Sequence, residues 1–176
     1  MQKTREEYNA VLQDCRDIFI RKNNDYGTSW RNFRPSSLTD QLLIKALRIR
    51  NIEQTGENRV GDDIRSEFKG IVNYGIIALV QLKVEAGTVS PENNEEILAL
   101  YDAAAAETRD LMLLKNADYG EAWREMRTSS FTDMILVKIA RIKQIEDNLG
   151  KTDISEGVDA NYQDIINYAI FALIRL

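Results

Sequence analysis

The 176-residue sequence contains no histidine and a single cysteine. Without histidine, Ser-His-Asp and Cys-His nucleophiles, a histidine general base and mixed Cys/His zinc sites are excluded. Cys15 cannot form an intrachain disulfide, and its place on an apolar helical stripe favours a packed thiol over a reactive one. If the protein is an enzyme, we therefore expect a carboxylate to act as the base.

Glycine and proline are also scarce, with nine and two residues, which disfavours turn-rich β-sandwiches and collagen-like chains. The N-terminal sequence lacks the apolar core of a signal peptide, and the longest apolar run, residues 168–174, is far shorter than the ~20 residues of a membrane span. The net charge of −5 provides no overall positive field. We expect a helical, cytoplasmic protein that binds neither membranes nor long nucleic acids.

The sequence is an internal duplication. Residues 16–53 align with residues 109–146 at a constant offset of 93, and 20 of the 38 aligned positions are identical. A one-residue insertion shifts the offset to 94, at which residues 67–82 align with residues 161–176. A period this long does not fit a solenoid, and two copies alone indicate a pair with pseudo-twofold symmetry around one shared core.

Each copy has the apolar periodicity of three helices. The spacing of Ser37 and Asp40 predicts a capping box at the start of the second helix, and Ser90 is the expected N-cap of the fourth. The second helix is apolar on nearly every side, so we expect it to be buried. The sequence thus predicts an all-α six-helix bundle built from two tandem three-helix repeats, residues 1–86 and 87–176.

Two cations recur three residues apart on the second helix of each copy, and they are Lys45, Arg48, Lys138 and Arg141. Because a buried cation needs a partner, each pair must meet carboxylates or an anionic ligand. One interpretation is a structural ion pair with a neighbouring helix. The other is a phosphate clamp, in which arginine offers a planar fork and lysine a point charge. The net charge of +5 over residues 16–50 favours the clamp.

The motif K-N-x-D-Y-G-x-x-W-R closes the first helix of each copy. A structural interpretation makes its glycine a C-cap, its lysine a partner of the helix dipole and its tryptophan a staple to the core. A nucleobase, however, needs a stacking surface beside hydrogen-bonding groups, which the tyrosine, tryptophan and aspartate offer. The candidate base-binding residues are Tyr26, Trp30, Tyr119 and Trp123, and the candidate catalytic carboxylates are Asp25 and Asp118.

The third helix of each copy carries a polar stripe on an otherwise apolar surface. In the second copy this stripe contains Asn161 and Asp164, and in the first copy the same positions hold Glu67 and Gly70. A carboxylate that faces a bundle core either pairs with a cation or holds a metal ion. Glu67 and Asp164 are therefore the candidate metal ligands, and their different positions indicate that the two sites have diverged.

Together, the K-N-x-D-Y-G-x-x-W motif, the K-x-x-R helix and the D-I-I-N-Y helix resemble the first nucleotide modification associated domain family. That family is similar to the all-α nucleotide pyrophosphohydrolases of the MazG type, which cleave a nucleoside triphosphate to a monophosphate and pyrophosphate. Those enzymes hold Mg²⁺ with E-E-x-x-E and E-x-x-D motifs. Here E-x-x-D falls on residues 67–70 and 161–164, each of which keeps one of the two acids. The resemblance implies nucleotide chemistry with Mg²⁺ as the cofactor.

Two hypotheses follow. In the first, the protein binds a nucleotide: the four helix-two cations hold the phosphates, the tyrosines and tryptophans hold the base, and phosphoanhydride hydrolysis is the expected reaction. In the second, the protein is a non-catalytic helical module, whose repeated charged residues form a buried network that fixes the pairing of the halves. Either version could form a homodimer.

Overall fold

The computed structural model of the chain describes residues 1–154 and 156–176. These residues form six α-helices and two short 3-10 helices, without any strand, which confirms the predicted all-α fold. In chain order the elements are α1 (Gln2–Tyr26), η1 (Ser29–Asn32), α2 (Pro35–Thr55), α3 (Ile64–Glu85), α4 (Asn94–Tyr119), η2 (Ala122–Glu125), α5 (Thr128–Asp147) and α6 (Val158–Arg175). The same succession of elements occurs twice, as the duplication predicts.

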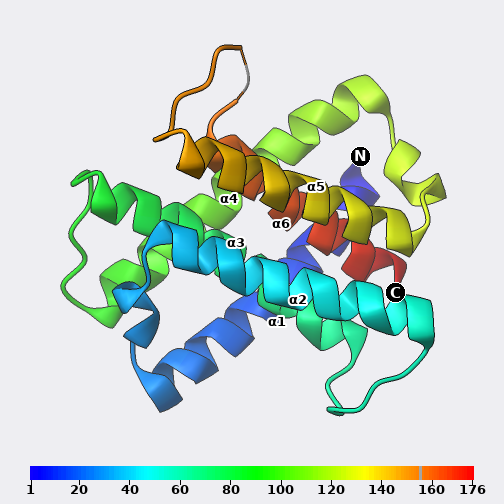
Figure 1. Cartoon of the computed structure of the whole chain (residues 1–176), viewed down its shortest axis with the longest axis horizontal. Helices are drawn as coiled ribbons and strands as arrows, with labels where there is room; N and C mark the ends of the chain where they lie inside the picture. The colour runs from blue at the N-terminus through cyan, green and yellow to red at the C-terminus, as the bar shows by residue number, and fades with distance from the viewer. Residues whose placement is uncertain (155) are drawn as a thin grey trace.

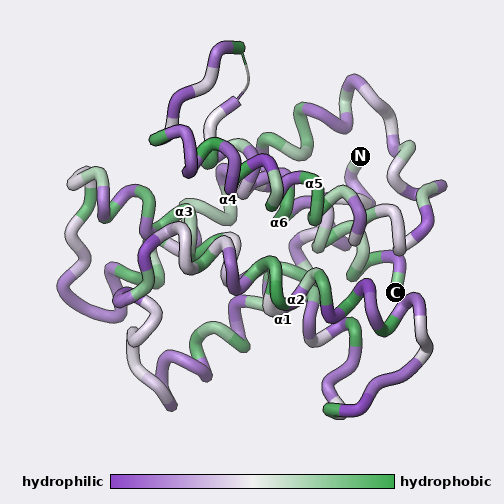
Figure 2. The backbone as a smooth tube through the Cα atoms, in the orientation of Figure 1, coloured by the Kyte–Doolittle hydropathy of each residue, from purple (hydrophilic) through white to green (hydrophobic). Residues whose placement is uncertain are grey.

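The central helices α3 and α6 pack against each other, and α2 and α5 cover them side by side (Figure 1). The hydrophobic residues gather where these helices meet, while the long connections are mostly hydrophilic (Figure 2). A Cβ atom at Gly75 would lie 2.6 Å from Cγ1 of Ile166, so α3 and α6 approach closely because this position is a glycine. The core of the molecule is therefore shared by both repeats.

Buried hydrogen bonds also join the two repeats. The Tyr8 hydroxyl of α1 donates to Oδ1 of Asn167 on α6, and the equivalent Tyr101 hydroxyl of α4 donates to Oδ1 of Asn73 on α3, each at 2.6 Å. Burial raises the pKa of both phenols, so they stay protonated as donors. The first helix of each repeat thus reaches across to the third helix of the other.

The predicted caps are wrong. Helix α2 begins at Pro35, and the Ser37 amide already donates to the Arg34 carbonyl, so Ser37 lies inside the first turn instead of preceding it. Proline at the first helical position starts the helix earlier, because its ring fixes a helical φ. Helix α4 is capped by Asn93, whose side chain accepts a hydrogen bond from the Glu96 amide, and Ser90 lies outside the helix.

Helix α2 is also less buried than predicted, because Ile44 and Leu47 are exposed. Val137 of α5, which is the repeat equivalent of Ile44, is exposed as well. The neighbours of α2 cover its Leu38, Leu42 and Ile49 side and leave the opposite side open. Among the described helices, none has the length and hydropathy to cross a membrane.

Cys15 is expected to be inert towards thiol reagents in the folded protein. Its side chain is fully buried in the core, and this burial raises the pKa of the thiol to about 12. The reagent attacks the thiolate, so labelling requires unfolding. Ellman's reagent should react slowly in buffer and rapidly in denaturant, and fast stoichiometric labelling in buffer would contradict the packing of α1.

Candidate functional site

Each repeat has a pocket of about 420 Å³ between its helices. The first-half pocket lies between α1, η1, α2 and α3, and the second-half pocket lies between α4, η2, α5 and α6. Seven pairs of identical, repeat-related residues line both pockets: Lys22 and Lys115, Asn23 and Asn116, Tyr26 and Tyr119, Gly27 and Gly120, Trp30 and Trp123, Asn73 and Asn167, and Tyr74 and Tyr168. The two pockets are therefore copies of one ancestral site.

The four aromatic residues predicted to bind a base all line these pockets. Trp30 and Trp123 are buried in the walls, whereas Tyr26 and Tyr119 are 73% and 78% exposed. The Trp30 indole nitrogen donates to Oδ1 of Asn23 at 3.2 Å, which fixes the ring against the end of α1. Each pocket thus combines a buried indole wall with an exposed tyrosine ring.

In the first half, Glu67 of α3 pairs with both cations of α2. Arg48 donates to Oε1 of Glu67 at 2.7 Å, and Nζ of Lys45 lies 3.4 Å from Oε2. Arg48 also donates to the side chain of Asn58 and the carbonyl of Asp62 at about 3 Å. Arg48 is therefore held by the protein itself, as the ion-pair interpretation expects, while Lys45 is held more loosely.

In the second half, Asp164 of α6 is the carboxylate that faces α5. Its two oxygens each lie 2.8 Å from a lysine, Lys115 of α4 and Lys138 of α5. Its first-half equivalent is Gly70, where an added Cβ would lie 2.8 Å from the Lys45 side chain. The acidic residue of the third helix thus lies about one helical turn later in the second repeat than in the first. Arg141 forms no hydrogen bond or ion pair with the described residues.

The predicted catalytic residues Asp25 and Asp118 are exposed in the last turns of α1 and α4, and neither lines a pocket. The acids that line the pockets are Asp62 and Glu67 in the first half and Asp164 in the second. Their roles in any reaction stay predictions.

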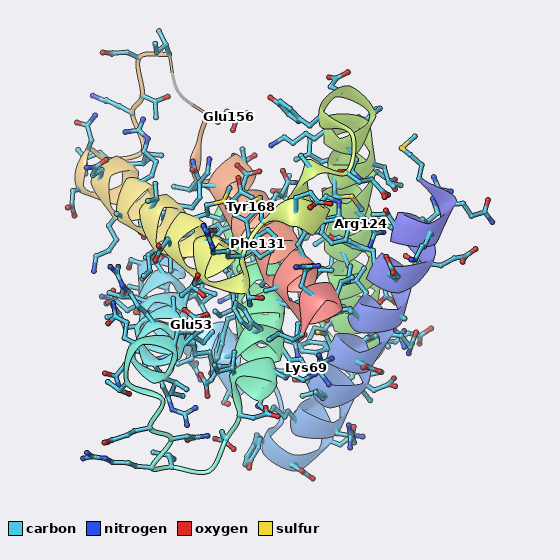
Figure 3. All side chains as sticks on the ribbon, turned by 90° about the vertical axis from the view of Figure 1, so that its right-hand side faces the viewer. Glu53, Lys69, Arg124, Phe131, Glu156 and Tyr168 are labelled. Atoms are coloured by element: carbon cyan, nitrogen blue, oxygen red, sulfur yellow. The ribbon has the colours of Figure 1, made fainter. Side chains whose placement is uncertain are left out.

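Lys69 and the pair Asn23 and Asn116 line the pockets although they were not singled out from the sequence. Lys69 lies on the side of α3 that faces α1, where it is 3.7 Å from Asp14 (Figure 3). Asn23 and Asn116 follow the lysine of the K-N-x-D-Y-G motif, so the motif itself contained their signal. Lys69 is replaced by a glutamine in the second repeat, which leaves no repeated pattern to reveal it.

The carboxylates of the two pockets do not fit a resident Mg²⁺ ion. Residues 1–154 and 156–176 contain no group of three or more acidic or cysteine side chains that could hold a metal. Glu67 and Asp164 line different pockets, and each already faces two cations, which would repel a divalent ion. Mg²⁺ binding by these two residues stays an untested prediction without support in the geometry.

The sequence matches the profile of a family described as nucleotide modification associated domain 1, over residues 22–82 and again over residues 115–176. Neither a curated protein nor a solved structure matches the chain, and a relationship to MazG-type enzymes is not shown. The two matched segments contain all seven identical pairs of pocket residues and span more than half of the chain. The chain belongs to the nucleotide modification associated domain 1 family and carries its domain twice.

Proposed function

We propose that the protein binds a nucleotide in the first-half pocket. The observation that carries this proposal is that none of the three lysines of this pocket forms a short ion pair with a carboxylate. Lys22 forms no ion pair with the described part of the chain, Lys45 lies 3.4 Å from Glu67, and Lys69 lies 3.7 Å from an exposed aspartate. These distances are longer than those of well-formed charge-assisted hydrogen bonds, so the lysines are available to an anion.

The aromatic side of the same pocket suits a base. Trp30 is already fixed by its bond to Asn23, and Tyr26 and Tyr74 add two rings with hydroxyl groups. A planar base can stack on an exposed tyrosine, and this contact is worth ~1–3 kcal/mol in nucleic-acid-binding proteins. A phosphate held by the lysines and a base held by the rings define a ligand of nucleotide size, for which a pocket of about 420 Å³ is large enough.

Hydrolysis of the nucleotide is a further step. Within the first-half pocket Glu67 is the buried carboxylate, but its oxygens already accept hydrogen bonds from Arg48 and Lys45. Such a residue is poorly placed to accept a proton from water. The geometry therefore favours binding, and cleavage to a monophosphate and pyrophosphate is tested by measuring pyrophosphate release with Mg²⁺ present.

A non-catalytic module is the second candidate, and the ion pairs favour it. Arg48, Lys45 and Lys138 all face carboxylates of a neighbouring helix, as expected for a network that fixes helix pairing. The two candidates differ in whether a ligand stabilises the fold. A thermal-shift screen with nucleoside mono-, di- and triphosphates, each with and without Mg²⁺, separates them.

A nucleotide at 100 times its dissociation constant should add about 2.7 kcal/mol of stability, which raises the Tm by several degrees in a chain of this size. The absence of any shift would support the structural module.

A homodimer through the exposed side chains Ile44, Leu47 and Val137 also stays a proposal, which sedimentation of the same sample tests.

Replacing Lys22 by alanine is expected to weaken nucleotide binding by about tenfold or more, because one charge-assisted hydrogen bond to a phosphate is lost. The matched control is Arg21→Ala, since Arg21 is also exposed and cationic but does not line the pocket. Both variants should keep the wild-type Tm without ligand. If Lys115→Ala weakens binding while Lys22→Ala does not, the nucleotide lies in the second-half pocket and the proposal is wrong.

A further inference from the structure

The second-half pocket contains two buried hydrogen-bond donors that have no partner. Nδ2 of Asn116 and Nε1 of Trp123 form no hydrogen bond within the described chain, although both side chains are more than nine-tenths buried. In the first half the equivalent indole nitrogen has a partner, because Trp30 donates to Oδ1 of Asn23. An unpaired buried donor costs ~1–3 kcal/mol, and both of these residues line the pocket. An acceptor on a bound ligand would satisfy them.

Lys115, which lines this pocket, and Lys138, which pairs with the same carboxylate, are not available to a phosphate. Lys115 and Lys138 each lie 2.8 Å from an oxygen of Asp164, which is itself buried. A phosphate placed near them would also face the Asp164 carboxylate. Burial raises the pKa of Tyr168 in the same pocket, and Asp164 raises it further, so this phenol stays protonated. The second-half pocket therefore disfavours an anionic ligand that the first-half pocket accepts.

The pocket has also become more apolar than its first-half counterpart. All three methionines beyond Met1 line it: Met112, Met126 and Met134 stand where the first repeat has Phe19, Phe33 and Gln41. Methionine side chains adapt to irregular shapes and contact aromatic rings favourably through sulfur. A second change removes a hydroxyl, because Ala122 replaces Ser29.

The Trp123 ring itself is not a free stacking surface. It stacks on Phe171 with the ring centroids 4.4 Å apart, and the guanidinium of Arg124 lies over it at 4.3 Å (Figure 3 labels Arg124). These contacts fix the plane of the indole, and its Nε1 group stays without a hydrogen-bond partner in the described chain. Tyr119 remains as the exposed ring of the pocket.

From these observations we propose that the second-half pocket binds an uncharged, planar, acceptor-bearing ligand of nucleobase or nucleoside size. Carbonyl oxygens and ring nitrogens of the ligand accept from Asn116 and Trp123, and the methionines cover its faces. The protein then holds two inequivalent sites, one for a phosphorylated ligand and one for a neutral ligand. This second site does not depend on the first, so either proposal can fail alone.

The test follows the indole N–H signal of Trp123 by NMR in the full-length protein. The chain has two tryptophans, and Trp30→Phe identifies which of the two indole signals belongs to Trp123. Free nucleobases and neutral nucleosides are titrated, and each nucleoside is compared with its own monophosphate. A hydrogen bond to the ligand should shift the Trp123 signal, and the neutral nucleoside should bind about tenfold or more tightly than its monophosphate.

The variant Asn116→Leu removes one donor at similar volume and should weaken binding of the neutral ligand by about tenfold. Its matched control is the equivalent Asn23→Leu, which should leave this binding unchanged. The proposal is overturned if no neutral base or nucleoside shifts the wild-type Trp123 signal, or if the monophosphate binds this pocket as tightly as the nucleoside. Both of these readings come from protein with an intact pocket, so they do not depend on how the leucine variants fold.

Discussion

Residues 1–86 and residues 87–176, expressed as separate fragments, should each fail to fold as a monomer. Each fragment contains one complete sequence repeat, but its third helix packs against the third helix of the other repeat. Ile71 and Ile76 of α3 and Ile165 and Ile166 of α6 are fully buried in the whole protein. Cutting the chain exposes this shared apolar surface to water, and each Å² of exposed apolar surface costs ~25 cal/mol of folding free energy.

The polar contacts between the repeats act in the same direction. Without the second repeat, Asn73 loses the Tyr101 hydroxyl; without the first, Asn167 loses that of Tyr8. Circular dichroism should show low helicity or self-association for each fragment, and mixing equal amounts should restore the helicity and cooperative unfolding of the whole chain. A monomeric fragment 1–86 that unfolds cooperatively would contradict the shared core.

The fold could be predicted because the duplication is carried by local patterns. The apolar stripes fix each helix, and the constant offset between repeats fixes their number and order. The predicted caps at Ser37 and Ser90 are wrong because Pro35 starts α2 before Ser37 and Asn93, not Ser90, caps α4. The exposure of Ile44 was missed since periodicity identifies an apolar side chain but not whether a neighbouring helix covers it.

The site could be predicted only in part. The repeated motifs contain the aromatic residues that line the pockets and Lys45 of the first-half pocket, while the binding roles predicted for them stay predictions. The pairing of Asp164 with Lys115 joins residues far apart in the sequence, and no spacing rule encodes it. The sequence does not reveal the unpaired donors of the second-half pocket either, because Asn116 and Trp123 stand in the same motif as Asn23 and Trp30 of the first repeat.

Glu67→Ala is expected to destabilise the protein by about 2–4 kcal/mol in chemical denaturation, the largest effect of any single site substitution considered. Glu67 is the carboxylate that separates Lys45 and Arg48, and its removal leaves two cations facing each other. Breaking a fully buried pair costs about 3–5 kcal/mol, and the loss here is smaller because the two cations are about one-fifth exposed.

Lys45→Met is the informative comparison, because it removes the weaker of the two partners. Arg48 still donates to Glu67 at 2.7 Å, so the carboxylate keeps its main hydrogen bond and the expected loss is about 1 kcal/mol or less. The double variant Lys45→Met with Lys138→Met should behave similarly, because Asp164 keeps Lys115. A loss of about 3–5 kcal/mol would instead make these lysines essential to the network and count against a role in binding phosphate.

Replacing the whole group, with Glu67→Leu, Lys45→Met and Arg48→Met together, should recover much of the stability lost in Glu67→Ala, since no charge is then left without its partner.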